Sequence, residues 1–230
     1  MPKVDPREAE DPANAMLAAL VDTLEAHGVE YAFTGSFTLA FWSQPRSSKD
    51  IDVVVLLEPD RSKRRALLHD LATAGFGVPT AALDDLERVH ATALDLPLRH
   101  GAKLIVELIV PEPEREALSR RIVSRARSIP LPLRPRGVRV VTPEDLVVYK
   151  LLLFRDGSRP LQTDDLKDIR DLVAMRKDDL DFGYIDLALD VEDSLPRAEV
   201  EKRRRWFDRT RAEFGKGRRP RQGPRRSGDR

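Results

Sequence analysis

Two aspartates separated by one residue stand at the start of a segment rich in β-branched residues. Asp50 and Asp52 open the run DIDVVVLL at positions 50–57, and this composition predicts a strand. Residues two apart on a strand point to the same face, so the two carboxylates are expected to lie side by side. A divalent cation is the simplest group that would offset their repulsion. The plainer alternative is that both acids face solvent where the strand begins.

A third acid interrupts a second apolar run. Glu107 lies within KLIVELIV at positions 103–110, where a lone carboxylate is expected to be either paired or functional. If this strand lies beside residues 50–57, Glu107 can join the two aspartates. Three carboxylates can hold two metal ions about 3.5–4 Å apart, an arrangement that activates an attacking hydroxyl. The alternative is a salt bridge between Glu107 and a lysine or arginine.

A Gly-Ser pair precedes the two aspartates and has the features of a phosphate-binding turn. Gly35 and Ser36 follow a short predicted strand and open a short helix, so backbone N–H groups and a hydroxyl could face a phosphate there. Arg46, Ser48 and Lys49 lie just before the aspartates and could supply charge for a triphosphate. Taken alone, the Gly-Ser pair is equally expected in an ordinary turn.

The composition narrows the choice of metal and of compartment. The chain of 230 residues has no cysteine, and its four histidines show no zinc-ligand spacing, which leaves oxygen ligands and Mg²⁺ or Mn²⁺. No apolar run approaches the ~20 residues of a membrane span, and the polar N-terminus does not resemble a signal peptide. We therefore expect a soluble cytoplasmic protein without a membrane segment.

The chemistry-bearing residues must be positioned by a small α/β unit that is followed by helices. Strands are expected at 30–34, 50–57, 103–110 and 138–141, with 88–94 as a further candidate and a proline-rich passage at 129–135. Helices are expected near 12–27, 37–42, 61–74, 113–126, 143–154, 163–176, 184–191 and 196–213. The predicted class is α/β (α+β), with a small mixed-sheet core at 12–141, a helical unit at 142–214 and a basic, disordered tail at 215–230.

The charge is distributed unevenly between that tail and the rest of the chain. Residues 215–230 carry seven Lys/Arg and one acid, a net charge of +6, whereas the whole chain carries +1 and residues 1–214 therefore carry −5. A basic tail on an acidic body fits a segment that follows nucleic acid. It fits a solvated extension that keeps the protein soluble equally well.

The order of these motifs resembles a known superfamily. TGS at 34–36 followed by RSSKDID at 46–52 is similar to the signature of DNA-polymerase-beta-like nucleotidyltransferases, and above all to its minimal members, which include abortive-infection-type toxins and aminoglycoside adenylyltransferases. The resemblance implies that the Gly-Ser turn holds nucleotide phosphates and that the aspartates bind metal. The third acid would complete the metal site and act as base. By position, these roles fall on Gly35, Ser36, Asp50, Asp52 and Glu107.

The resemblance continues into the predicted helices and covers about residues 30–175. TPEDLVVYKL at 142–151 and KDIRDL at 167–172 resemble the toxin-type members in particular. In those proteins a lysine and an aspartate on successive helices lie near the nucleotide, which implies that Lys150 contacts phosphate and that Asp168 supports it. Without the resemblance, Lys150 would be read as an exposed helix lysine.

Together these features predict an Mg²⁺-dependent nucleotidyltransferase that moves an NMP from an NTP to a hydroxyl. The toxin-type resemblance and the basic tail favour RNA, such as a tRNA end, as acceptor, and a cognate antitoxin as partner. A small-molecule acceptor of the aminoglycoside kind is the second enzymatic alternative. A catalytically inactive nucleotide-binding partner module is the non-enzymatic one.

Overall fold

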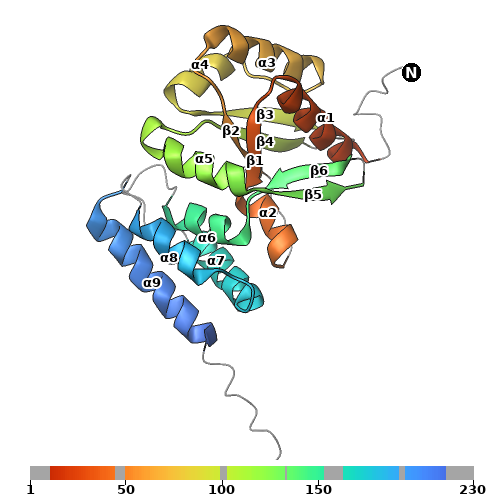
Figure 1. Ribbon diagram of the computed structural model, residues 1–230. Coiled ribbons are helices and arrows are strands. Elements are labelled where there is room, and N and C mark those ends of the chain that lie inside the picture. Colours follow the sequence, from red (N-terminus) through yellow and green to blue (C-terminus); the bar gives the residue numbers. More distant parts are fainter. Residues whose placement is uncertain are drawn as a thin grey trace, which may run out of the picture.

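The chain folds around one mixed sheet, flanked by helices and followed by a helical bundle (Figure 1). The computed structural model describes residues 11–44, 50–98, 103–132, 134–152, 163–191 and 195–215. The sheet has six strands in the order β3-β4-β2-β1-β6-β5. Their bounds are β1 Glu30–Thr34, β2 Asp50–Leu56, β3 Ala91–Pro97, β4 Lys103–Ile109, β5 Arg127–Leu131 and β6 Arg134–Val140. The α/β class predicted from the sequence is confirmed.

Some of the helices begin at capping residues of the sequence. Their bounds are α1 Pro12–Ala26, α2 Gly35–Trp42, α3 Arg61–Thr73, α4 Ala82–Arg88, α5 Glu116–Arg125, α6 Pro143–Leu152, α7 Thr163–Arg176, α8 Phe182–Asp190 and α9 Arg197–Gly215, with a short 3-10 turn at Pro113–Arg115 before α5. The side chains of Asp11 and Asp60 accept hydrogen bonds from the first backbone N–H groups of α1 and α3. Each thereby satisfies donors that have no partner within the helix.

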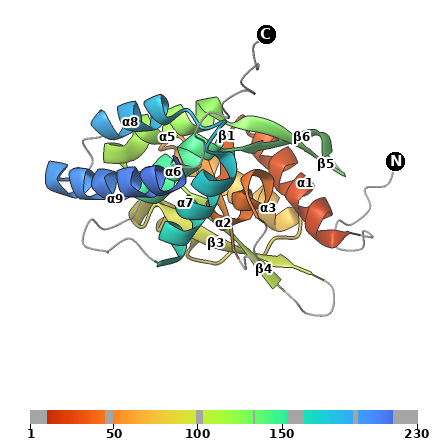
Figure 2. The ribbon, with the colours of Figure 1, turned by 90° about the horizontal axis from the view of Figure 1, so that it is seen from below.

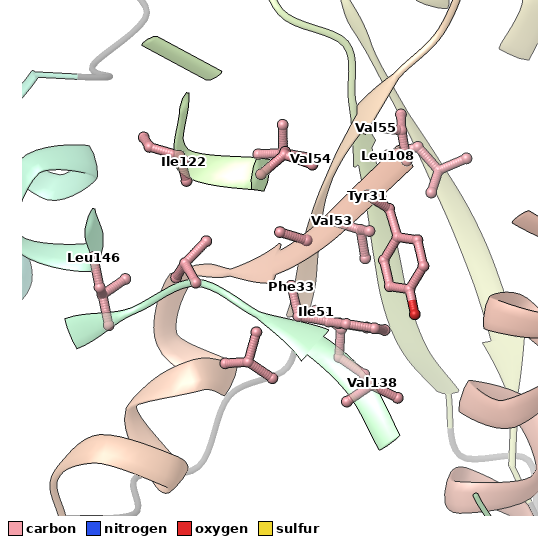
Figure 3. Packing of buried hydrophobic residues seen from close by; sticks show 14 of the residues in the cluster. Tyr31, Phe33, Ile51, Val53, Val54, Val55, Leu108, Ile122, Val138 and Leu146 are labelled. Atoms are coloured by element: carbon pink, nitrogen blue, oxygen red, sulfur yellow. The ribbon is translucent and has the colours of Figure 1, made fainter. Parts of the chain in front are cut away.

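The central position of β2 explains its unbroken valine run. β2 pairs with β1 on one side, antiparallel, and with β4 on the other, parallel. Val53, Val54 and Val55 are all buried, because helices and neighbouring strands cover both faces at this end of β2, as expected for an interior strand. Figure 3 shows Val55 near Tyr31 and Leu108, and Val54 on the other side of the strand, near Ile122 of α5.

Two sequence predictions differ from the structure near the edges of the sheet. The strand predicted at 88–94 lies three residues further on, because Arg88 still belongs to α4 and β3 runs from Ala91 to Pro97. The proline-rich passage contains an unpredicted strand, β5, which pairs with β6 and has an irregular register between Ile129 and Leu131. As an edge strand, β5 tolerates a proline that an interior strand would not.

The helices after the sheet share its hydrophobic core. α6 is buried along almost its whole length, and one contiguous cluster of buried side chains runs from Met16 of α1 to Phe207 of α9. In both ribbon views α6 lies between the sheet and the helices α7, α8 and α9 (Figures 1 and 2). Among the described helices, none has the length and apolar character needed to cross a membrane.

Candidate active site

The three acids singled out from the sequence lie on one face of two adjacent strands. In the parallel pairing of β2 and β4, Asp52 is directly opposite Glu107, and Asp50 is opposite Ile105. Residues in register on neighbouring strands point to the same face, with Cβ atoms about 5 Å apart. Asp50 is exposed, whereas Asp52 and Glu107 are partly buried. The face is therefore more enclosed at Asp52 and Glu107 than at Asp50.

The Gly-Ser turn packs directly against one of these acids. Thr34, the last residue of β1, is opposite Asp52 in the antiparallel pairing, and Gly35 follows with a positive φ of 67°. A Cβ atom on Gly35 would overlap the Asp52 carboxylate. Only glycine fits at this position, both because of its φ and because the backbone approaches the carboxylate so closely.

The first turn of α2 begins without a capping side chain. α2 starts at Gly35, and within the described part of the chain its N-cap, Thr34, makes no capping hydrogen bond with its side chain. The Thr34 hydroxyl is fully buried and has no hydrogen-bond partner among the residues that the structure describes. Helix N-termini with unsatisfied N–H groups attract anions. A phosphate is therefore compatible with this end of α2, next to the acid pair.

The surroundings of Asp52 disfavour its charged form in the absence of a cation. Burial and, next, the neighbouring Glu107 carboxylate raise the pKa of Asp52 to about 6, with smaller contributions from Asp50 and Asp165, while the Lys150 ammonium opposes the shift. A carboxylate held in this way gains from a nearby positive charge. This donor set of hard oxygen ligands on one face fits Mg²⁺ or Mn²⁺.

The acids do not yet form a closed ligand cage. Within the described part of the chain, no three carboxylate or histidine side chains converge closely enough on one point to hold a metal ion as they stand. Asp50 is exposed at the start of β2 and Glu107 is only partly buried, so both side chains have room to turn towards Asp52. Their role as metal ligands stays a prediction.

Lys150 is buried rather than exposed, and two carboxylates hold it. Its Nζ lies 2.9 Å from Oδ1 of Asp165 and 2.9 Å from Oδ2 of Asp168. The Lys150 side chain is 6% exposed and that of Asp168 2%. The structure thus brings together the lysine and aspartate that the sequence paired, close enough to Asp52 for the ammonium to affect its pKa. The contact of Lys150 with phosphate stays a prediction.

Asp165 is the residue of this cluster that the sequence interpretation missed. It lies three residues before Asp168 on α7, so both carboxylates project from the same side of the helix. That i, i+3 spacing was visible in the sequence, but an acid in the first turn of a helix usually serves the helix dipole. Only the buried partner, Lys150, distinguishes Asp165 from such an acid.

Three of the predicted nucleotide-binding residues cannot be placed relative to this site. Arg46, Ser48 and Lys49 lie outside the described residues. Gly35 and Ser36 are at the start of α2 as predicted, and Asp50 directly follows the undescribed segment 45–49. The site as described therefore consists of the α2 start, the acids of β2 and β4, and the Lys150 cluster of α6 and α7.

The strand acids beside a glycine turn fit the nucleotidyltransferase class expected from the sequence, and comparison with known families agrees. The family described as "Nucleotidyl transferase AbiEii toxin, Type IV TA system" matches residues 17–223. The chain belongs to this family of nucleotidyltransferases. No functionally curated protein matches the sequence.

Solved structures align with the chain at low sequence identity. An antigenic nucleotidyltransferase-like protein from Paracoccidioides brasiliensis is 16% identical, with a TM-score of 0.47, over 87% of this chain and 90% of that one. The antibiotic-resistance factor ANT(2″)-Ia, in complex with adenylyl-2″-tobramycin, is 13% identical, with a TM-score of 0.44, over 86% of this chain and 98% of that one.

Proposed function

We propose that this chain transfers a nucleoside monophosphate from an NTP to a hydroxyl of RNA, with a tRNA end as the acceptor. The observation that carries the proposal is the placement of Asp52, which lies opposite Glu107 and in contact with the Gly35 turn. A phosphate-binding turn and a pair of acids at one point are what transfer from a triphosphate requires.

The side chains divide the work of the reaction between them. N–H groups at the start of α2, with the Ser36 hydroxyl, would bind the triphosphate, and Asp50, Asp52 and Glu107 would hold Mg²⁺ or Mn²⁺. When bound, this ion supplies positive charge to the phosphates and acidifies the attacking hydroxyl. The acceptor oxygen forms a bond to the α-phosphorus, the bond to the β-phosphate oxygen breaks, and pyrophosphate leaves.

Glu107 and Lys150 take the remaining roles. Glu107, on the strand beside Asp52, would accept the proton of the attacking hydroxyl at a carboxylate oxygen. Lys150 would contribute positive charge towards the phosphates while Asp165 and Asp168 fix its position. Arg46, Ser48 and Lys49 precede Asp50 in the chain and would complete the neutralisation of the triphosphate.

RNA as acceptor and an antitoxin as partner rest on separate observations. The net charge of +6 at residues 215–230 favours a polyanionic acceptor. The family description names a type IV toxin–antitoxin system, and we therefore expect a cognate antitoxin as partner. We expect this antitoxin to restore growth of cells that express the chain without inhibiting transfer by the purified protein, because both proteins would act on one shared target.

The acceptor is tested by incubating the purified protein with each α-labelled NTP, Mg²⁺ and total RNA. We expect one NTP to label RNA, and size separation of the product to show the label on the tRNA fraction. Treatment with ribonuclease should release all of the label. Label that appears on an added small hydroxyl compound, and never on RNA, would contradict the assignment of the acceptor while preserving nucleotide transfer.

A further inference from the structure

Four arginines lie near two aromatic rings at the junction of the sheet with the helical bundle. They come from α5, β5 and α7 and form what we call the arginine cluster: Arg121, Arg125, Arg127 and Arg176. The guanidinium carbons of Arg125 and Arg121 lie 3.8 and 5.9 Å from the centre of the Tyr184 ring on α8. Those of Arg127 and Arg176 lie 6.0 and 5.8 Å from the Trp42 ring at the end of α2.

Hydrogen bonds connect both rings to one segment of the chain, residues 141–145. The Trp42 indole donates to the backbone oxygen of Val141, and the neighbouring Thr142 donates its hydroxyl to Asp145. The Asp145 carboxylate also accepts hydrogen bonds from Arg125 and from the Tyr184 hydroxyl. The rings are thereby fixed to the same short segment, Arg125 stacks on Tyr184, and the other arginines lie beside the rings.

Two of the four arginines carry a charge that is not neutralised within the described part of the chain. Arg125 is paired with the fully buried Asp145 at 3.0 Å, and Arg176 with Asp179 at 3.7 Å. Arg121 and Arg127 make no ion pair with any residue that the structure describes. Arg127 is exposed, and Arg121 is partly exposed with its Nε atom buried, so a ligand can reach Arg127 fully and Arg121 in part.

Two helices set the distance between the Trp42 side of the arginine cluster and the candidate active site. α2 begins at Gly35, next to Asp52, and ends at Trp42, a rise of about 10 Å. α7 carries Asp168 in the Lys150 cluster and ends at Arg176, a rise of about 12 Å. Figure 2 shows α5 and α8 along one side of the molecule, with α2 and α7 between them and β3 and β4.

We propose that the arginine cluster binds the sugar–phosphate backbone of the RNA acceptor, about three nucleotides from the reacting end at a rise of about 3.4 Å per nucleotide. The inference rests on the proposed function, because it assumes that RNA is the acceptor. Planar guanidinium forks match phosphate oxygens. Exposed guanidinium planes supported by rings also offer surfaces on which unpaired bases stack.

The chemistry of the cluster favours nucleic acid over an acidic protein surface. An acidic protein partner would present carboxylates on long, mobile side chains, and exposed ion pairs of that kind contribute little. A strand of RNA presents regularly spaced phosphates that the guanidinium groups of the cluster can bind together. RNA bound at the cluster would also have its reacting end near Asp52, as an acceptor must. A protein ligand would not need to reach Asp52.

The test measures binding of a fluorescent oligouridine by anisotropy over a range of KCl concentrations, without NTP. The test variant is Arg121→Glu/Arg127→Glu, and Arg121→Ala/Arg127→Ala repeats it without charge reversal. The matched control is Arg65→Glu/Arg88→Glu, which reverses two exposed arginines on α3 and α4. Circular dichroism confirms that each variant is folded before binding is compared.

We expect both cluster variants to weaken RNA binding at least about tenfold. We also expect the slope of the logarithm of the binding constant against log[salt] to fall by about two, one for each phosphate that the variant no longer binds. The control should change neither quantity appreciably. Equal effects in the cluster variants and the control would overturn the proposal. So would binding of poly-L-glutamate as tight as that of oligouridine, since the surface would then recognise carboxylates equally well.

The same variants separate this proposal from the proposed function. In the transfer reaction, the cluster variants should raise KM for RNA about tenfold and leave KM for the NTP unchanged, because the arginine cluster is remote from the triphosphate. A wild-type protein that binds RNA through the cluster but transfers no nucleotide would refute the proposed function alone. Transfer to RNA with an unchanged KM for RNA in the cluster variants would refute RNA binding by the cluster and leave the proposed function intact.

Discussion

At the scale of single residues, Gly35 and Asp52 depend on each other. Gly35 has a φ of 67° and its backbone lies against the Asp52 carboxylate. We expect Gly35→Ala to slow nucleotide transfer about 100-fold, because the new methyl group must displace the carboxylate that we propose holds the metal ion. Steady-state rates of label transfer measure this effect.

Gly28 provides the matched control for this substitution. It has a similar φ of 65°, but a Cβ there would meet no atom of the described residues within 4 Å. Gly28→Ala should therefore cost about 1–2 kcal/mol in the free energy of unfolding from backbone strain, with transfer near the wild-type rate. If Gly28→Ala and Gly35→Ala impair transfer equally, backbone strain and not the contact with Asp52 explains the loss.

Lys150 differs from the surface lysines in what its removal leaves behind. Lys150→Met leaves two carboxylates in a buried site without their cation, and we expect it to lower the free energy of unfolding by about 3–5 kcal/mol. Lys103→Met, which breaks an exposed pair with Asp95, should cost less than about 1 kcal/mol. Urea unfolding of both variants gives the comparison, and similar losses would show that the Lys150 cluster is not effectively buried.

The site could be predicted from the sequence only where a local rule determined the direction or the environment of a side chain. Strand alternation was enough to place Asp50 and Asp52 on one face, and the apolar run around Glu107 made that acid conspicuous. The direct pairing of Glu107 with Asp52 depends on which strands are neighbours, a property of the whole sheet. Asp165 could not be recognised because its distinguishing feature is a buried lysine on another helix.

At the scale of elements, Asp145 ties three helices together. Its side chain is fully buried, caps the start of α6 with Thr142, and accepts hydrogen bonds from Arg125 of α5 and Tyr184 of α8. Burial and the hydrogen bond to Asp145 both raise the pKa of the Tyr184 hydroxyl above its ordinary value. The phenol therefore stays a donor across the physiological pH range.

We expect Asp145→Asn to lower the free energy of unfolding by about 3 kcal/mol, because the amide cannot accept from three donors and leaves the Arg125 charge unpaired. The control is Asp190→Asn, where the lost acid pairs with Arg204 at an exposed site, and the expected loss is below about 1 kcal/mol. Guanidinium unfolding followed by circular dichroism compares the two variants. Equal losses would mean that Asp145 does not link the helices energetically.

Elements with a strong local signal were predicted well and those at the sheet edges were not. The capped helices α1 and α3 and the β-branched strand β2 follow from propensity and capping residues. β5 contains a proline that argues against a strand, and it forms because β6 offers a partner along an open edge. The start of β3 was misplaced because α4 continues to Arg88, a boundary that no capping residue marks.

At the scale of the whole molecule, the sheet and the helical bundle share one core. The buried cluster extends without a break from α1 to α9, so neither part can unfold without exposing apolar surface of the other. We therefore expect a single cooperative unfolding transition. The two tryptophans report on the two parts, since Trp42 ends α2 and Trp206 lies on α9.

Fluorescence of the variants Trp42→Phe and Trp206→Phe follows each remaining tryptophan separately during urea unfolding. Each variant is compared with its own circular-dichroism transition, which cancels any change in stability caused by the substitution. We expect the fluorescence and circular-dichroism midpoints to coincide in both variants. A Trp206 signal that changes well before the circular dichroism of the same variant would show that the bundle unfolds independently.

Nucleotidyl transfer itself is tested most directly by the fate of two phosphates. The purified protein is incubated with Mg²⁺ and RNA, and with the active NTP labelled at either the α- or the γ-phosphate, beside Asp52→Asn and the exposed control Asp95→Asn. We predict α-label on RNA and γ-label in pyrophosphate for the wild type and Asp95→Asn, and neither for a folded Asp52→Asn. Transfer of the γ-label to RNA, or undiminished α-label transfer by Asp52→Asn, would contradict the assignment of this site.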